Sequence, residues 1–448
     1  MTEKELAAAG GDPGFKTQFA YSFGLFPSGL LSGIMGAWLM YYYCPPADSG
    51  AVTYINPATF GFLMFLLNIP SALADPTVGH FSDRTRSRWG RRLPYILFGA
   101  PVLALSFVLL WFPPVHGESP FNVAWMFGTV LIYFLSFTAV VNPFLAIMPE
   151  IWQTEKGRMS VSSLMSVTQG VGTLLSFAAG ALISALAGGV LFLGLKLNPY
   201  MVVGLLGGAL CLLGYLPTLR YIRETPYNEK KEIPYSIWRS GWQTLKNPAF
   251  LPYLLSVAAV NTSTTLIIAM LPYQATVIAG STEGIAGALL GALMLLAMLC
   301  LPLVNWITGK YPRRIVYLVC CFAMSVVIGL LYFSSALPGV PPLLFMGVVL
   351  FFAAPFVSVF LVVPRTILAD VMDYDEKITG YRREAMYNGM ESLIGKLPIG
   401  LAPWIMGLLF THYGNTVANP AGIKLCAFAS GGIALLAFVA FLFYPLKK

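Results

Sequence analysis

The chain has 448 residues, of which 57% are hydrophobic and only 10% charged, and its formal net charge is +8. This charge does not indicate a nucleic-acid-binding protein, because the basic residues lie in short loops between apolar segments and form no solvated face. The six cysteines show no CxxC spacing and the three histidines no HExxH spacing, so we predict no disulfide, metal or cofactor site.

Apolar segments fill most of the chain. A helix needs about 20 predominantly apolar residues to cross the hydrocarbon of a bilayer. Alternating β-barrel strands are absent, so the spans are expected to be helices, and residues 1–16, with mixed charges and no apolar core, are not expected to be a secretory signal. We therefore predict an all-α membrane protein with twelve transmembrane helices, at residues 17–44, 57–79, 94–113, 121–148, 159–189, 199–222, 248–278, 284–308, 314–335, 341–369, 387–411 and 421–446.

Lysine and arginine are distributed unevenly between the loops. Five loops contain none of them: 45–56, 114–120, 279–283, 336–340 and 412–420. The loops of the other set contain most of them: 80–93, 150–158, 223–247, 309–313 and 370–386. The positive-inside rule places this second set, and with it both termini, in the cytoplasm. Lys196 and Lys424 are exceptions, too few to overturn the pattern.

The longest polar connection, residues 220–247, divides the segments six and six. Each half has a basic turn between its second and third segments, "SDRTRSRWGRR" in the first half and "TGKYPRR" in the second. This shared mark predicts two pseudo-symmetric six-helix bundles, residues 1–222 and 248–448, joined by a cytoplasmic middle loop at 223–247. A transport site at the interface between the bundles follows from such repeats.

Several motifs resemble those of a known family. "GHFSDRTRSRWGRR" (79–92) resembles the loop signature of the major facilitator superfamily, in which a glycine, an aspartate and arginines brace neighbouring helix ends. With "DVMDYDEKITGYRREAMYNGMESLIGK" (370–396), "LMYYY" (39–43) and "NPFLAIMP" (142–149), the chain is similar over its whole length to the glycoside–pentoside–hexuronide:cation symporters. The resemblance implies the fold of that superfamily and cation-coupled uptake by alternating access.

The resemblance also implies a conformational latch at the basic loops. A carboxylate there can accept charge-assisted hydrogen bonds from arginines or helix-terminal amides, and a glycine permits close helix approach. The alternative is that these charges only anchor the topology. The expected latch residues are Gly79, Asp83, Arg84, Arg88, Arg91 and Arg92 in the first half, and Asp373, Arg382 and Arg383 between the tenth and eleventh segments.

Ionisable residues inside the predicted segments are candidate functional residues. A charge at the bilayer centre costs roughly 2.5–3.5 kcal/mol on insertion scales. We single out Asp75 in the second segment and Glu391 and Lys396 in the eleventh. Asp75 continues a polar stripe with Asn68 and Ser71, which we expect to face a watery cavity. Lys396 needs a partner, and Asp75 is a better candidate than Glu391, which is turned about 140° away around the helix.

Each of these residues also has a simpler interpretation. Asp75 can be a carboxylate at a helix end in the membrane interface. Lys396 can face a water-filled vestibule without a specific role.

The family resemblance assigns a cation-coupling site. In a sugar-transporting member, two carboxylates one turn apart on the second helix and a threonine of the fourth helix bind the cation. Asp75 corresponds to the second carboxylate and Thr138 to the threonine, but Ser71 replaces the first carboxylate. A lone carboxylate offers Na⁺ little charge compensation, whereas burial favours the protonated form of such a group. We therefore favour H⁺ as the coupling ion, with Na⁺ left open.

The solute site departs from that relative. The positions of its sugar clamp correspond here to Gly29, Val141 and Ser166, so an α-galactoside clamp is missing, although the lysine is retained. The polar groups suit a glycoside, whereas the many apolar side chains suit an amphiphile such as a lysolipid equally well. For each Asn or Thr taken alone, a hydrogen bond between helices is the alternative to a solute contact. The expected solute contacts are Lys396, Glu391, Asn68, Asn142, Gln169, Asn261, Thr265, Tyr273 and Gln274.

An enzyme and a sensor are the other classes of function to consider. The sequence has no His/Asp cluster in its spans, no GxSxG and no GxxxxGK[ST] loop, so we predict neither an enzyme nor ATP-driven transport. A non-transporting sensor on the same fold remains an alternative, but a sensor need not keep Asp75 and Lys396. The prediction is a monomeric symporter in the cell membrane that carries a small-molecule solute.

Overall fold

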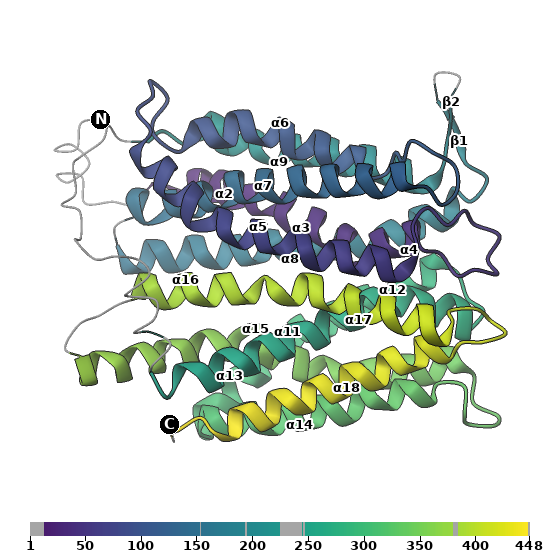
Figure 1. The fold of residues 1–448 in the computed structure, drawn as a ribbon. Helices are drawn as coiled ribbons and strands as arrows, with labels where there is room; N and C mark the ends of the chain where they lie inside the picture. The colour runs from purple at the N-terminus through teal and green to yellow at the C-terminus, as the bar shows by residue number, and fades with distance from the viewer. Residues whose placement is uncertain are drawn as a thin grey trace.

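Figure 1 shows a computed structural model of the chain, and the structure describes residues 13–152, 154–192, 195–224, 244, 247–379 and 384–446. Its first half contains α2 (Phe15–Ser22), η1 (Phe23–Leu25), α3 (Phe26–Ile34), η2 (Met35–Leu39), α4 (Met40–Tyr43), α5 (Pro57–Arg84), α6 (Leu93–Leu109), α7 (Pro120–Ile151), α8 (Glu155–Ala185), β1 (Val190–Phe192), β2 (Leu195–Leu197) and α9 (Pro199–Tyr221). Here η1 is a 3₁₀-helix and η2 a π-helix.

The described residues of the second half form helices and the loops between them. It contains α11 (Phe250–Tyr273), the π-helix η3 (Gln274–Ile278), α12 (Glu283–Leu299), α13 (Leu301–Lys310), α14 (Arg313–Gly329), the 3₁₀-helix η4 (Leu330–Phe333), α15 (Pro342–Thr379), α16 (Glu384–Gly395), α17 (Leu397–Tyr413) and α18 (Ala421–Leu442).

The predicted spans appear in the predicted order. Ten stretches of the described residues are helical, long and apolar enough to cross a membrane, and the pair α12 and α13, bent by 42°, forms an eleventh if it is one span. At the position of the third predicted segment lies α6, an apolar helix of 17 residues that is shorter than these spans. The all-α membrane fold is thereby confirmed. The sequence analysis missed a short antiparallel hairpin between α8 and α9, in which three residues of β1 pair with three residues of β2.

Several spans begin with the same local signal. Asn56, Ser119 and Asn198 each cap a helix whose first residue is a proline, and their side chains accept a backbone hydrogen bond at 3.0, 3.2 and 2.8 Å. A polar cap satisfies an amide that has no partner within the helix. Proline is favoured at the first position because its missing N–H needs no partner there. These signals set the starts of α5, α7 and α9.

The helices form two groups along the chain, with α2 to α9 in one and α11 to α18 in the other (Figure 1). The β1–β2 hairpin lies at one end of the molecule, which we call the hairpin end. The loop between α5 and α6 lies at the opposite end, where α18 also ends, and we call this the arginine-loop end. Between the two groups, α5 packs against α17, α8 against α12, and η2 against α11.

The two groups touch most closely toward the hairpin end, at glycines. Gly61 and Gly407 lie where α5 meets α17, and Gly180 and Gly287 lie where α8 meets α12. A Cβ atom added at any of these four positions would collide with the backbone of the facing helix. Small residues permit such close helix packing, and these contacts close the hairpin end.

Candidate functional site

A cavity of about 330 Å³ lies between the two groups of helices. This volume is at the lower end of the range of about 300–1,000 Å³ for small-molecule sites. Its polar lining comes from Ser28, Ser32, Asn68, Ser71, Gln169, Thr173, Thr265 and Lys396. Its apolar lining includes Met35, Met40, Phe60, Met64, Phe134, Phe137 and Phe177. We call this space the central cavity.

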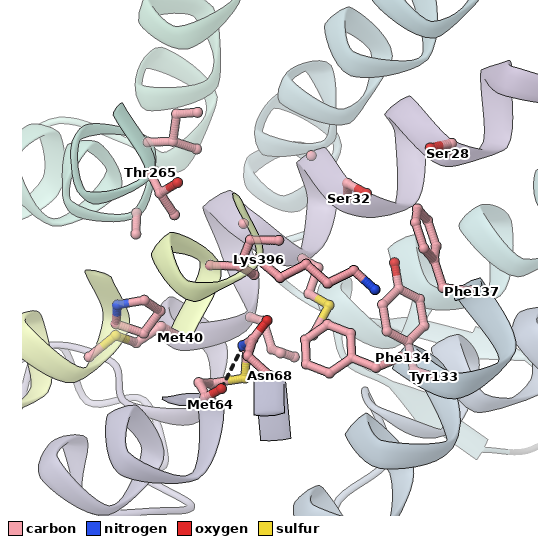
Figure 2. A pocket seen from close by; sticks show the side chains of 18 of the residues that line it. Ser28, Ser32, Met40, Met64, Asn68, Tyr133, Phe134, Phe137, Thr265 and Lys396 are labelled. Atoms are coloured by element: carbon pink, nitrogen blue, oxygen red, sulfur yellow. Dashed lines mark hydrogen bonds between the residues drawn. The ribbon is translucent and has the colours of Figure 1, made fainter. Parts of the chain in front are cut away.

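Lys396 enters the central cavity from a break in a helix. It occupies the junction between α16, which ends at Gly395, and α17, which begins at Leu397. The sequence analysis placed Lys396 within the eleventh span, and the structure also has Met386–Tyr413 as one span, with a one-residue interruption of the helix at Lys396 that the sequence analysis did not predict. Pro398 explains the break, because its ring lacks an N–H and clashes with the carbonyl one turn earlier. Figure 2 shows the Lys396 side chain extending toward the side where Tyr133, Phe134 and Phe137 lie.

The Lys396 ammonium bonds to all three residues that were predicted to form the cation site. Its Nζ lies 2.7 Å from Asp75 Oδ1, 3.1 Å from Thr138 Oγ1 and 3.2 Å from Ser71 Oγ, and it also donates to the Ser71 carbonyl at 3.0 Å. Asp75 is the partner that was expected for this lysine. The ammonium therefore takes the place that a coupling cation would occupy between these oxygens.

The Asp75 carboxylate is bonded on both of its oxygens. Besides Lys396, Asn142 Nδ2 donates to Oδ1 at 2.9 Å, and Ser392 Oγ donates to Oδ2 at 3.2 Å. The side chains of Asp75 and Lys396 are only 14% and 19% exposed. A buried ion pair is tolerated when hydrogen bonds satisfy its remaining atoms. A proton added to Asp75 would remove its charge and release the lysine.

Three other predicted solute residues line the central cavity. Asn68 Nδ2 donates to the Met64 carbonyl at 2.6 Å, and Thr265 Oγ1 donates to the Asn261 carbonyl at 2.8 Å, so each is partly satisfied by its own helix. The Asn68 bond is drawn in Figure 2. Gln169 is exposed and lines the same cavity. All three retain atoms for hydrogen bonds to a solute.

Tyr273 and Gln274 do not line the central cavity of this structure, contrary to expectation. Tyr273 OH donates to the Cys44 carbonyl at 2.8 Å, and its ring packs on Tyr41 at 4.9 Å between centroids. Tyr41 OH in turn donates to Thr276 Oγ1 at 3.1 Å. Gln274 is fully buried, and neither polar atom of its side chain has a partner among the described residues. These residues belong to the closed hairpin end.

A second cavity, of about 270 Å³, lies between α11, α15 and α16. Two predicted residues, Asn261 and Glu391, line it together with Ser392, which bonds to Asp75. Glu391 Oε1 accepts a hydrogen bond from Tyr253 OH at 2.6 Å. Arg365 also lines this cavity. The sequence analysis missed Arg365, although it lies in the tenth predicted segment and the criterion applied to Asp75 would have found it.

Carboxylates that the sequence analysis did not name hold the arginine loop. Arg91 and Arg92 both form ion pairs with Glu150 at the end of α7, the latter at 3.0 Å. Glu224, just after α9, accepts the backbone amides of Arg91, Arg92 and Leu93 at 2.5, 3.0 and 2.8 Å. Gly90 has φ of 104° and lies against Glu224, so a side chain there would be strained.

The second half of the chain has a related pair. Arg313, at the start of α14, bonds to Asp370 at 2.8 Å in the last third of α15. Arg313 belongs to the basic turn that the sequence analysis identified as the repeat of the first-half loop. In each half, the helix after the basic turn is therefore tied to the following helix by an arginine and a carboxylate.

The other expected latch residues differ in their surroundings. A Cβ atom added at Gly79 would meet no described atom within 4 Å, so the close helix approach expected there is absent from the described structure. Arg84 is the last residue of α5, and Arg88 lies over the Trp89 ring at 4.4 Å. Asp373 is exposed. The Asp83 side chain and both Arg382 and Arg383 lie outside the described residues.

Known proteins resemble this chain in sequence and in fold. It is 24% identical to the isoprimeverose transporter of Lactiplantibacillus pentosus, over 90% of this chain and 81% of that protein. It is also 24% identical to the glucuronide carrier protein homolog of Escherichia coli, over 96% and 93%. An uncharacterized symporter of Synechocystis sp. is 30% identical over 38% of this chain, and the match spans 31% of that relative.

A crystal structure of a D-xylose-proton symporter superposes on this structure with a TM-score of 0.67 and 14% identity, covering 97% of this chain and 98% of that chain. At this identity the likeness concerns the fold alone. The family model described as MFS/sugar transport protein matches residues 20–448. Because this match covers nearly the whole sequence, the chain belongs to the MFS/sugar transport protein family.

Proposed function

We propose that this chain is a proton-coupled symporter that carries a sugar or glycoside-type solute by alternating access. Membership of its family establishes a multi-pass membrane transporter of small-molecule solutes, not an enzyme. The observation that carries the proposal is the Lys396 ammonium, bonded to Asp75, Thr138 and Ser71 beside the central cavity. A site that already contains an internal cation has no free carboxylate for Na⁺, but it can still be switched by a proton.

The proposed units of motion are the bundles at residues 1–222 and 248–448, with 223–247 as the loop between them. The positive-inside rule, applied to the basic loops, supports a cytoplasmic arginine-loop end. In this proposal both termini are cytoplasmic and the closed hairpin end faces outward. The structure then corresponds to an inward-facing arrangement in the plasma membrane. Because one chain supplies both bundles and thus a complete cavity, we propose that the monomer is the working unit.

The proposed coupling step is a proton transfer to Asp75. Protonation breaks its ion pair, and the freed Lys396 ammonium can donate hydrogen bonds to a solute in the central cavity. Asn68, Gln169 and Thr265 offer further donors and acceptors to solute hydroxyl groups. Asn142, which bonds to Asp75, holds the carboxylate in place. When the proton leaves, the lysine returns to Asp75 and the solute loses this contact, so proton and solute move together.

The isoprimeverose and glucuronide relatives support a sugar-type solute. One observation favours a second candidate, a lysolipid or another amphiphile, because methionine and phenylalanine side chains form much of the lining of the central cavity. Flexible methionine side chains accommodate irregular apolar ligands. No comparable observation favours a non-transporting sensor. The ion pair joins α5 of one bundle to the junction of α16 and α17 in the other, and a carrier that couples a proton to the movement of its bundles needs such a link.

Uptake into proteoliposomes tests the proposal. Purified protein is reconstituted, and accumulation of radiolabelled isoprimeverose, lactose, a glucuronide and a lysolipid is measured under a pH gradient, a Na⁺ gradient or neither. Asp75→Asn is the test variant, and Asp370→Asn, which also neutralises a paired aspartate, is the matched control.

We expect a pH gradient alone to drive accumulation of a sugar-type solute. Asp75→Asn should abolish accumulation and keep exchange. Asp370→Asn, outside both cavities, should slow uptake at most and should still accumulate the solute. Accumulation that requires Na⁺ would overturn proton coupling, and lysolipid uptake without sugar uptake would select the second candidate.

A further inference from the structure

The second cavity is separate from the central cavity but adjoins the same ion pair. Ser392 lines it and donates to Asp75, and Gly395 of its lining directly precedes Lys396. A group bound there would therefore lie beside a residue that bonds to Asp75 and beside the residue that precedes Lys396. The cavity therefore has the right position to take part in solute binding.

Arg365 is the cationic side chain of this cavity. It lies within α15, an apolar span, directly after Pro364. The side chain is exposed, and it makes no hydrogen bond or ion pair with any residue that the structure describes. A charged residue in a span carries an insertion cost and typically marks a substrate or ion pathway. Its five N–H donors form a fork that matches an anionic group in two-point geometry.

Glu391 lines the same cavity without contacting the Arg365 guanidinium. Its carboxylate accepts a hydrogen bond from Tyr253 at 2.6 Å, and it forms no ion pair with Arg365. Asn261 and Asn388 complete the polar lining. A cation without a partner among the described residues, a carboxylate acceptor and two amides in one small space suit a ligand that combines an anionic group with hydroxyl donors.

We propose that the second cavity is a subsite for an anionic group of the transported solute, which Arg365 binds in two-point geometry while Glu391 accepts a neighbouring hydroxyl. The inference rests on the proposed transport function, because it assigns part of the same solute. The anionic group is a carboxylate, as in an acidic sugar, or a phosphate, as in a lysophospholipid. Both groups present the same pair of oxygens to a guanidinium.

Equilibrium binding without any gradient tests this inference. The full chain is placed in nanodiscs, and two matched pairs of ligands are titrated: methyl glucuronide against methyl glucoside, and lysophosphatidylglycerol against monoacylglycerol. The variants are Arg365→Gln and Arg365→Lys. Arg220→Gln, an exposed arginine at the end of α9 outside both cavities, is the control. Melting temperatures establish that each variant is folded.

We expect Arg365→Gln to raise the Kd of the anionic member of one pair at least tenfold and that of its neutral member less than twofold. Arg365→Lys should fall between, because it keeps the charge and loses the fork, and Arg220→Gln should match the wild type. The pair that responds identifies the source of the anion. Equal loss for both members, no loss for either anion, or no binding of either anion would overturn the subsite.

The transport proposal fails separately from this one. Charge discrimination through Arg365 without proton-driven uptake would remove the coupling assignment and keep the subsite. Proton-driven uptake with no discrimination would keep the transporter and remove the subsite.

Discussion

Removing either member of the Asp75–Lys396 pair is expected to destabilise the protein, and removing both is expected to cost less than the sum. Lys396→Met keeps most of the apolar stem of the side chain and removes its charge, and Asp75→Asn keeps the shape of the carboxylate. Each single variant leaves one charge buried with neutral partners only. For Asp75, these partners are Asn142 and Ser392.

The burial of the pair sets the magnitude. Breaking a fully buried ion pair costs about 3–5 kcal/mol. Here the side chains are 14% and 19% exposed and keep other hydrogen bonds, so we expect about 2–3 kcal/mol for each single variant, less than for complete burial. The double variant has no unpaired charge, and we expect a coupling energy of about 2 kcal/mol between the two sites.

Unfolding of the purified variants in mixed micelles measures these free energies. The pair Arg313–Asp370, in which the arginine side chain is 42% exposed and the aspartate side chain 13%, is the comparison with one solvated partner, and its coupling energy is expected to be about 1 kcal/mol or less. Uptake by each variant is measured in parallel. Additive losses in the Asp75→Asn, Lys396→Met double variant, or wild-type uptake by Lys396→Met, would refute the reasoning.

Three further outcomes are expected. Gly180→Leu places a side chain against the backbone of α12, so the hairpin end should fail to close, uptake should fall, and cysteines introduced there should become more accessible to reagents; unchanged labelling would contradict this. Glu224→Ala leaves three amides without their acceptor and should lower stability by about 1–3 kcal/mol, whereas a wild-type melting temperature would rule out a clamp. Glu150→Gln weakens the ties to Arg91 and Arg92 outside both cavities, so turnover should fall more than solute affinity, and the reverse pattern would exclude a latch.

The sequence predicted the spans and the central ion pair for physical reasons. Without alternating strands for a β-barrel, a chain can cross a bilayer only as long apolar helices, so segment lengths indicate where it crosses. Charges are so rare in these segments that Asp75 and Lys396 had few alternative partners. The break at Lys396 was also visible, since Pro398 follows it by two residues, but a proline can kink a span without ending a helix.

Features that depend on the conformation or on distant partners were not predictable. Glu224 clamps amides more than 130 residues earlier in the chain, and no local pattern marks that contact. Gln274 is polar and lies in a span, but whether it faces a cavity or the closed end depends on how the bundles are tilted. The same holds for glycines, because Gly79 is open in this arrangement while Gly180 contacts a facing helix.

The internal pairing of Lys396 with Asp75 has a consequence for the response to membrane voltage. The empty carrier presents a neutral pair, so its return across the membrane moves no net charge. With Asp75 protonated and a neutral solute bound, the lysine gives the loaded carrier one positive charge, and a potential of 100 mV then biases that step by about 2.3 kcal/mol. An anionic solute would cancel this charge and make uptake electroneutral. Current recordings therefore distinguish the two kinds of solute without chemical identification of either.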